Sequence, residues 1–402
     1  MTATHGRRLL QVTTVPDTLE AFLVPFAEHF RGMGWEVEAA ANGATTNEAC
    51  LVAFDAVHDV PWKRSPFSAA NAVAAYKIRK IVSEGGFDLV HVHTPVAAFV
   101  TRLALMRHRP GPAVVYTAHG FHFHNTGNPV TNRLYALLEK RAAPRTDWLV
   151  VINSEDEASA RTLRLVPKER LTLLPGIGVD IESFQLRSRE AAEPSSLKAS
   201  LGLPPDAVAV LIAAEFTPNK RHVDAIRALK KLEPLLPNAH LLLAGEGRTK
   251  ARAQELVDSL QLADKVHFLG HRKDIPALLK ASNALMLLSE REGLPRSILE
   301  AMAVGTPVIG TRIRGVSDLL ADGAGYLVPV GDIESIARAM SRVISVPDEA
   351  ALVVARAHER VQGSAIAVIL KAYEEVYENA LSAACPCAVE GDSKQAPAAA
   401  DQ

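Results

Sequence analysis

The 402-residue sequence contains only three cysteines, and two of them, Cys385 and Cys387, lie close to its C-terminal end. So few cysteines, so placed, give no disulfide framework of the kind that stabilises small extracellular domains. The sequence therefore favours a reducing compartment, and we expect a cytoplasmic protein.

Long apolar runs are also missing. No run approaches the roughly 18 residues needed to span a bilayer, and the N-terminal segment lacks the apolar core of a signal peptide. A peripheral contact with the inner face of the cell membrane stays open, because segments 62–64 and 77–80 combine basic with apolar residues. The alternative is that they belong to ordinary solvated helix faces.

Charge of one sign is not in excess either, since the formal net charge is -1. A near-neutral chain lacks the basic field of a general nucleic-acid binder, so we expect no nucleic-acid partner.

What the sequence does contain is a twofold series of strand and helix patterns, in a chain too long for one core. The first series predicts strands at 8–13, 35–40, 88–93, 113–117, 148–152 and 171–174. The second predicts strands at 208–213, 240–244, 266–269, 284–288, 307–309 and 325–328. The expected fold class is α/β, with two Rossmann-like, doubly wound domains facing across a cleft.

The expected limits follow from this series and from changes in composition. They are an N-terminal domain at 1–185, a polar linker at 186–205, a second domain at 206–362, a C-terminal helix at 363–382 and a disordered tail at 383–402.

Segment 289–309 is the most informative stretch. It predicts a turn and a short helix between two buried strands, with Pro295 near the helix start and Gly305 just past its end. Glu292 lies in the turn and Glu300 within the helix. Ligands of open α/β sheets bind at this edge, and helix N-termini attract phosphate, so two carboxylates here suggest recognition of sugar hydroxyls on either side of a phosphate. Ordinary surface glutamates are the alternative.

Several motifs occur in a characteristic order. They are 88–95, 116–124, 175–180, Asn219-Lys220, Glu292-x7-Glu300, 313–315 and 322–329. With this order and spacing, the region 8–379 resembles a family 4, retaining glycosyltransferase of the GT-B fold. Within that family it is most similar to bacterial capsule and exopolysaccharide transferases.

The resemblance implies that 1–185 is the acceptor-side domain, that 206–362 binds the nucleotide sugar, and that the helix at 363–382 returns to the first domain. It also implies roles for individual residues. It places His119 against the donor sugar, Lys220 at the diphosphate, Glu292 on the hexose hydroxyls and Glu300 on the ribose. The expected catalytic residues are His119, Lys220 and Glu292. The expected donor-binding residues are Lys220, Arg221, Glu292, Gly293, Leu294, Arg296 and Glu300.

The sequence departs from the family pattern in two places. Glu215 stands where many members have arginine, five residues before the motif lysine, and we interpret it as subfamily character. The loop 13–18 lacks the glycine pair of many members. Pro295 has no amide hydrogen, so Gly293, Leu294 and Arg296 are the better backbone donors.

The same resemblance implies a reaction without metal or other cofactor, because a helix N-terminus and basic side chains stabilise the leaving diphosphate. A histidine set could in principle bind zinc. Its members are His91, His93, His119, His122 and His124. We favour polar lining of the cleft over a metal site.

The expected activity is that of a hexosyltransferase (EC 2.4) that moves a hexose or N-acetylhexosamine from a nucleotide sugar, with UDP the expected nucleotide, to a glycan or polyprenyl-linked acceptor. Two alternatives remain at this point. One is a UDP-sugar 2-epimerase of the GT-B fold. The other is a catalytically silent sugar-nucleotide-binding protein, which the acidic Glu215 suggests.

Overall fold

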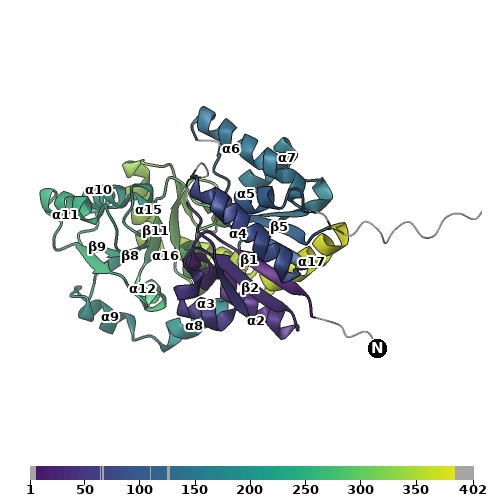
Figure 1. Cartoon of the computed structure of the whole chain (residues 1–402). Coiled ribbons are helices and arrows are strands. Elements are labelled where there is room, and N and C mark those ends of the chain that lie inside the picture. Colours follow the sequence, from purple (N-terminus) through teal and green to yellow (C-terminus); the bar gives the residue numbers. More distant parts are fainter. Residues whose placement is uncertain (1–5, 64, 66–67, 109, 125–126, 385–402) are drawn as a thin grey trace, which may run out of the picture.

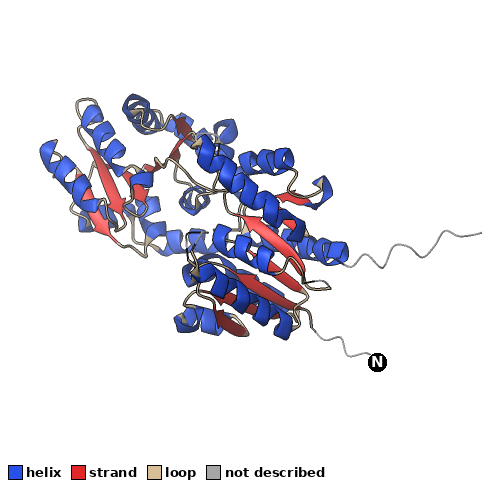
Figure 2. Ribbon diagram, turned by 45° about the horizontal axis from the view of Figure 1, so that its top comes forward, coloured by secondary structure: helices blue, strands red, loops and turns tan. Residues whose placement is uncertain are grey.

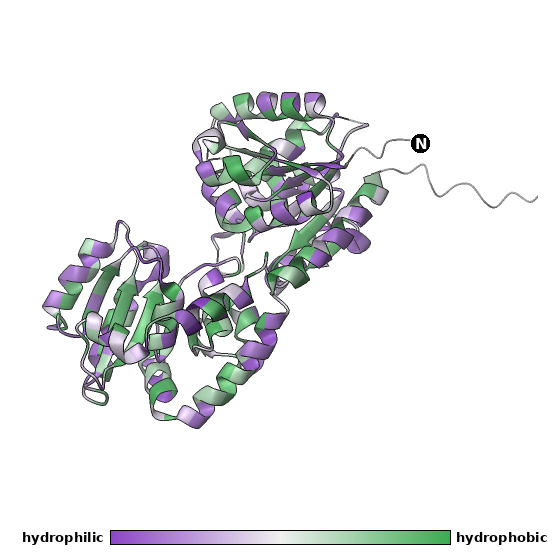
Figure 3. Ribbon diagram, turned by 90° about the horizontal axis from the view of Figure 1, so that it is seen from below, coloured by the Kyte–Doolittle hydropathy of each residue, from purple (hydrophilic) through white to green (hydrophobic). Residues whose placement is uncertain are grey.

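The computed structural model describes residues 6–63, 65, 68–108, 110–124 and 127–384. They form two α/β units, each built around its own parallel sheet (Figures 1 and 2). In Figure 3 the strands inside both units are mostly hydrophobic, whereas the surrounding helices alternate between hydrophobic and hydrophilic residues. This pattern is typical of parallel sheets that helices cover on both faces.

The first sheet has seven parallel strands in the order β3-β2-β1-β4-β5-β6-β7. The strands are β1 (Arg8–Val12), β2 (Glu36–Ala41), β3 (Ala56–Asp59), β4 (Leu89–Val92), β5 (Ala113–Ala118), β6 (Trp148–Val151) and β7 (Leu171–Leu173). The longer helices of this unit are α2 (Val24–Gly32), α3 (Glu48–Ala53), α4 (Ala70–Gly85), α5 (Pro95–Ala104), α6 (Pro129–Ala142) and α7 (Ser154–Leu163). The short ones are α1 (Pro16–Thr18), the π-helix η1 (Leu19–Leu23), η2 (Ala44–Thr46), η3 (Ala143–Arg145) and η4 (Lys168–Arg170).

The second sheet has six parallel strands in the order β10-β9-β8-β11-β12-β13. The strands are β8 (Val208–Ala213), β9 (Ala239–Ala244), β10 (Val266–Gly270), β11 (Ala284–Leu287), β12 (Val308–Thr311) and β13 (Tyr326–Val328). Its helices are η5 (Pro218–Lys220), α10 (His222–Leu232), α11 (Lys250–Ser259), α12 (Ile275–Ala281), α13 (Arg296–Val304), α14 (Val316–Leu319), η6 (Ala321–Gly323), α15 (Ile333–Ser345) and α16 (Pro347–Gln362).

In both sheets the strand order reverses direction, between β1 and β4 in the first and between β8 and β11 in the second. Ligands of doubly wound sheets bind beyond the carboxyl ends of the strands at such switch points. Loops after β1, β4, β8 and β11 are therefore the ones that the topology places for ligand binding.

Three helices join the two units. Helix α8 (Ile181–Glu190) and helix α9 (Pro194–Ser200) occupy much of the segment that the sequence suggested as a linker. Ile181 and Phe184 of α8 are buried in the core of the second unit. The polar composition of this segment reflects the outer faces of packed helices.

The C-terminal helix α17 (Ile366–Ala384) crosses back and packs on the first sheet beside β5, as Figure 1 shows. Its Tyr373 and Tyr377 are fully buried in the core formed with β1 and β2. Residues 383 and 384 of the expected tail belong to this helix, and 385–402 lie outside the described residues.

Two details differ from the sequence interpretation. Strand β3 was not predicted, because its four residues Ala-Val-His-Asp are only half-buried at the sheet edge and carry no apolar pattern. The lipid contact suggested for 62–64 is wrong at Trp62, which is buried in the core under α4, while Arg64 lies outside the described residues. Among the helices described, none has the length and apolar character required to cross a membrane.

Candidate active site

The loops that follow β5 and β11 touch each other, and glycine makes this contact possible. A side chain on Gly293 would place its Cβ 1.9 Å from the carbonyl oxygen of His119. On the other side of the same loop, a Cβ on Gly315 would lie 1.8 Å from the Gly293 carbonyl oxygen, and Gly315 has a φ of +71°. A larger residue at 293 would push the two units apart, and one at 315 would displace the Gly293 turn, so both glycines affect how closely His119 approaches the second unit.

Lys220 and Glu292 form the charged pair at this junction. The Lys220 Nζ donates to Glu292 Oε1 at 2.6 Å, and both side chains are largely buried. Backbone and amide bonds between Asn219 and the segment 290–291 hold the two loops together. The structure thus brings together two residues that the sequence placed 72 positions apart.

The two arginines that were expected to bind the donor, Arg221 and Arg296, form ion pairs with carboxylates. Arg221 has left-handed backbone and donates to Asp224 and Glu290, so its guanidinium is already paired. Arg296 pairs with Glu300 at 2.9 Å and donates to the Ala21 carbonyl of the first unit at 2.8 Å. In this structure Arg296 therefore bridges the two units.

The side chain of Leu294 packs against other apolar residues. It is partly buried against the core of the second unit, and its Cδ2 atom would lie 2.7 Å from a Cβ on Gly176. Its side chain thus meets the segment that leaves the first unit.

Glu300 lines a cavity of about 540 Å³ beyond the ends of β8, β9 and β10. Its carboxylate is 14% exposed, and burial raises its pKa against the lowering effect of Arg296. Glu215 lines the same cavity with Gly245, Gly247, His271 and Arg272. His271 and Arg272 follow strand β10 without a recognisable motif, so nothing in the sequence pointed to them as site residues.

His119 stands at the end of a chain of buried hydrogen bonds. Its Nε2 lies 3.2 Å from Nδ1 of His93, and His93 Nε2 lies 2.7 Å from the Gln11 Oε1 oxygen. Because Gln11 Oε1 can only accept, His93 carries its proton on Nε2 and accepts from His119 through Nδ1. This arrangement leaves Nδ1 of neutral His119 free as a hydrogen-bond acceptor.

The chain continues into α17. Gln11 Nε2 donates to the Tyr377 hydroxyl, which lies 2.7 Å from His91 Nδ1, and the other nitrogen of His91 lies 2.7 Å from Thr117 Oγ1. Burial lowers the pKa of His91 and His93 well below the usual value, and lowers the pKa of His119 to about 4. These rings are therefore neutral near pH 7.

The histidine set does not gather as metal ligands. Among the described residues, no group of three or more histidine, cysteine or carboxylate side chains has an arrangement that could hold a metal ion. The His122 ring packs against Tyr135 instead, tilted by 42° with ring centroids 4.8 Å apart. The absence of a metal requirement stays a prediction.

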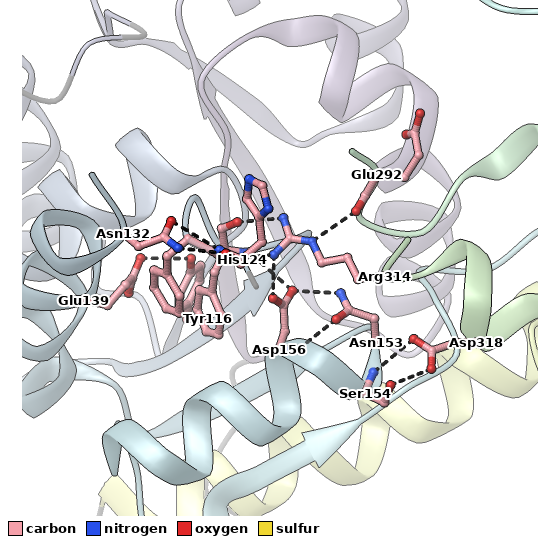
Figure 4. Close-up of polar contacts among 12 residues, drawn as sticks. Tyr116, His124, Asn132, Glu139, Asn153, Ser154, Asp156, Glu292, Arg314 and Asp318 are labelled. Carbon is pink, nitrogen blue, oxygen red and sulfur yellow. Dashed lines mark hydrogen bonds and ion pairs between the residues drawn. The ribbon is translucent and has the colours of Figure 1, made fainter. Parts of the chain in front are cut away.

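Arg314 is the main residue that the sequence analysis left without a role. It is 5% exposed and reaches from the second unit to Asp156 at 2.9 Å and to the carbonyl oxygens of Phe121 and Phe123 (Figure 4). It also donates to the Glu292 carbonyl at 3.2 Å. One guanidinium thus fixes the β5 loop, helix α7 and the Glu292 turn to one another.

A larger cavity of about 910 Å³ lies between the units beside this arginine. Helices α6 and α7 form one wall, and the loops after β11 and β12 form the other. Arg133, Arg291 and Arg312 line it, together with Glu155, Glu290 and Asp318. Asp318 is engaged by Ser154 of α7, so part of its charge is already satisfied.

Two Rossmann-like units joined in this way, with paired glutamate and lysine loops at the junction, define a glycosyltransferase of the GT-B fold. Two family models agree with this. Residues 195–360 match Glycosyl transferases group 1, and residues 19–183 match Glycosyltransferase Family 4. The chain belongs to the family 4 glycosyltransferases, which makes it a hexosyltransferase of class EC 2.4.

Among its relatives is EpsD of Bacillus subtilis (strain 168), itself named as a glycosyltransferase, at 35% identity over 85% of this chain and 88% of that protein. Another is the Escherichia coli UDP-Gal:alpha-D-GlcNAc-diphosphoundecaprenol alpha-1,3-galactosyltransferase, at 30% identity over 66% of this chain and 68% of that protein.

Solved structures share the fold. Anabaena HepE, in complex with UDP and glucose, has a TM-score of 0.74 at 20% identity, over 92% of this chain and 99% of that one. WaaG, a glycosyltransferase involved in lipopolysaccharide biosynthesis, has a TM-score of 0.70 at 18% identity, over 92% of this chain and 99% of that one. The GT-B fold predicted from the sequence is confirmed.

Proposed function

We propose that this enzyme transfers a hexose or N-acetylhexosamine from a UDP-sugar to a lipid-linked saccharide, with retention at the anomeric carbon, in the synthesis of a cell-surface polysaccharide. The observation that carries the proposal is the Lys220–Glu292 pair beside His119, with the Glu300 cavity next to it. Similarity to a UDP-Gal-dependent transferase that acts on a diphosphoundecaprenol-linked sugar supports the choice of donor and acceptor.

The donor fits along this line of residues. The Glu300 cavity takes the nucleoside, and the carboxylate of Glu300 accepts from the ribose hydroxyls. Lys220 then neutralises the diphosphate, with the N-terminus of α13 contributing its positive end. Glu292 and Nδ1 of His119 accept hydrogen bonds from the hexose, because both present acceptors at the junction of the units.

Lys220 is held in position by its ion pair with Glu292. An arriving diphosphate competes for the ammonium group, so binding frees Glu292 to accept from a sugar hydroxyl. The pairing gives a largely buried lysine and a largely buried glutamate a counter-charge each.

The transfer itself needs no nucleophile from the protein. The acceptor hydroxyl oxygen attacks the anomeric carbon on the face that the diphosphate leaves, and the bond from that carbon to the phosphate oxygen breaks. The acceptor proton passes to an oxygen of the leaving diphosphate. Lys220 stabilises the negative charge that develops there, which is an electrostatic form of catalysis.

The 910 Å³ cavity between the units is our candidate for the acceptor. Arg133, Arg291 and Arg312 give it three cationic side chains that suit the diphosphate of a carrier lipid. The cavity adjoins the Glu292 turn through Arg314, which keeps the acceptor close to the donor.

The test is a screen of UDP-hexoses and UDP-N-acetylhexosamines against saccharides linked to a diphosphate lipid, read by mass spectrometry. We expect one donor and acceptor pair to give product, and NMR coupling constants to show the same anomeric configuration as the donor. EDTA should leave the rate unchanged.

Three outcomes would contradict the proposal. A new sugar nucleotide formed without acceptor indicates an epimerase. Binding of the donor with no turnover on any acceptor indicates a catalytically silent binding protein. An inverted anomer in the product rules out front-face attack.

A further inference from the structure

A groove of about 700 Å³ on the first unit is lined by five cationic side chains, namely Lys140, Arg161, Arg164, Lys168 and Arg170, and by no carboxylate. It lies where the chain enters β6 and β7. His119 follows the carboxyl end of β5, so the groove is at the opposite end of the same parallel sheet. We call this feature the cationic groove, and it is distinct from the donor site.

The charges of the cationic groove are mostly uncompensated. Arg161 pairs with Glu157 one helical turn away. None of the other four has an ion pair within the part of the chain that the structure describes. Lys140, Arg164 and Lys168 are exposed, and the neighbouring Glu169 is exposed as well but does not line the groove. Such a concentration of like charge repels itself and attracts an anionic surface.

Helix α6 adds an apolar surface next to the groove. Val130, Leu134 and Leu137 are 79%, 41% and 57% exposed, and their spacing of four and three residues puts them on one helical face. The opposite face is fixed to the protein by the buried Glu139, which pairs with Arg102 at 2.7 Å. The apolar stripe therefore points to solvent because the other side of the helix is anchored.

Arg133 and Lys140 flank this stripe on the same side, since they are seven residues apart. Lys140 also lines the cationic groove, and Arg133 lines the 910 Å³ cavity between the units. One helix thus connects an apolar stripe, a cationic groove and the candidate acceptor cavity. In Figure 1, α6 lies at the outer edge of the first unit, next to α7.

We propose that the α6 stripe and the cationic groove together form the surface by which the protein docks on an anionic phospholipid bilayer. An amphipathic helix inserts apolar side chains among the headgroups while neighbouring cations bind anionic lipids. A free polyanion would use the groove but would leave the stripe exposed to water. The lipid contact is independent of the function proposed above. Delivery of a lipid-linked acceptor to the 910 Å³ cavity at the start of α6 rests on that function.

Helix α4 is the competing surface. Val73 and Tyr76 are 58% and 73% exposed, and lysines lie nearby on the same helix. However, Lys77 lies 3.9 Å from Asp59 and Lys80 lies 3.9 Å from Glu84, which leaves Arg79 as the cation of α4 without an ion pair among the described residues. Charge complementarity to an anionic surface therefore favours α6.

The test is co-sedimentation of the full chain with vesicles of phosphatidylcholine alone or with phosphatidylglycerol. We expect binding only with phosphatidylglycerol, and weaker binding at high salt. The Leu134→Glu/Leu137→Glu variant and the Lys140→Glu/Lys168→Glu variant should each lower the partition coefficient at least tenfold, since one cation near the surface contributes about fivefold. Leu235→Glu, at a leucine 73% exposed on the second unit, should leave it unchanged.

Several results would overturn this proposal. They are equal binding to neutral vesicles, unchanged binding of both α6 and groove variants, or loss of binding with Val73→Glu/Tyr76→Glu alone. Binding of inorganic pyrophosphate to the groove without any vesicle binding would assign it to a soluble anion. Donor hydrolysis in solution and the midpoint of thermal unfolding, measured for each variant, separate a docking defect from loss of catalysis or folding.

Discussion

Lys220 is paired with Glu292, so its charge is held in a fixed position beside the proposed diphosphate site. We expect Lys220→Ala to lower turnover at saturating donor by about 100-fold or more, the usual effect of losing one preorganised electrostatic contact. The midpoint of thermal unfolding should move little. Steady-state kinetics at saturating donor give the measurement.

A matched control is Lys230→Ala, which removes a lysine paired with Glu233 on the surface of α10. Exposed pairs of this kind contribute little to stability, and this one lies outside the proposed site. Near-normal turnover in Lys220→Ala would refute the role of this lysine.

The two motif glutamates have different surroundings, and this difference predicts different binding defects. Glu300 lines the 540 Å³ cavity, while Glu292 faces Lys220. Glu300→Gln should weaken both the UDP-sugar and free UDP, because a hydrogen bond to a charged group contributes about 1.5–3 kcal/mol. Glu292→Gln should weaken binding of the UDP-sugar and cut transfer without weakening free UDP, because it removes a carboxylate that competes with the diphosphate for Lys220.

Calorimetric titration of UDP and of the UDP-sugar into both variants measures this difference. Equal weakening of free UDP by Glu292→Gln and Glu300→Gln would show that the division between sugar and ribose is wrong.

His119 should stay neutral throughout the physiological pH range, because burial lowers its pKa to about 4. Its Cε1 resonance should therefore not shift between about pH 8 and pH 5.5, whereas an unperturbed histidine titrates near pH 6.5. NMR of protein labelled in histidine, with His119→Gln for assignment, gives the test. A titration midpoint near pH 6.5 for this resonance would disprove neutral His119 as a hydrogen-bond acceptor.

The same lowered pKa has a consequence for stability. The unfolded chain binds protons on these histidines near pH 6.5, while the folded chain does so only at lower pH. Acid therefore favours unfolding, and the contribution of His119 to stability is complete above about pH 6.5 and is lost as pH falls toward 4. His91 and His93 act in the same direction.

Helix α17 contributes polar contacts as well as apolar packing to the first unit. The Tyr377 hydroxyl accepts from Gln11 and lies beside His91, all within a fully buried region. Tyr377→Phe removes the hydroxyl and leaves two buried polar groups without this partner. We expect a loss of about 1–3 kcal/mol in the free energy of unfolding.

Chemical denaturation of Tyr377→Phe measures this loss. Tyr76→Phe is the matched control, because Tyr76 is 73% exposed on α4 and should show no change. If both variants unfold at the same denaturant concentration as the unmodified protein, the buried network adds nothing to stability.

Arg314 and Asp156 connect the two units, at 5% and 1% exposure of their side chains. Removing either partner leaves a buried charge uncompensated, so Arg314→Ala and Asp156→Ala should each cost about 3–5 kcal/mol. The double variant should cost clearly less than the sum of the two single losses, because it leaves neither charge alone.

Thermal unfolding of the three variants completes this double-mutant cycle. Losses that simply add would mean that the pair does not couple the two units. A normal unfolding midpoint with reduced transfer would instead assign Arg314 to positioning of the Glu292 turn.

The sequence by itself determined, in outline, most of the strands and the division into two doubly wound α/β domains. Continuous apolar runs such as 208–213 are buried strands, and Gly305 ends α13 with a φ of +87°, as its position after the helix predicted. The resemblance to the family likewise assigned Glu292 and Lys220 to the same donor site. Strand runs and helix ends depend on residues that are neighbours in the chain, so the sequence shows them directly.

Only the tertiary structure decided which distant side chains form ion pairs and hydrogen bonds with one another. Arg314 and Asp156 are 158 residues apart, and nothing in either neighbourhood identifies the other as its partner. The pairing of Arg221 with Glu290, the path from His119 to α17 and the cations of the groove also depend on how the helices pack. Electrostatic energies depend on the distance between charges in space and on their burial, and the local sequence determines neither quantity.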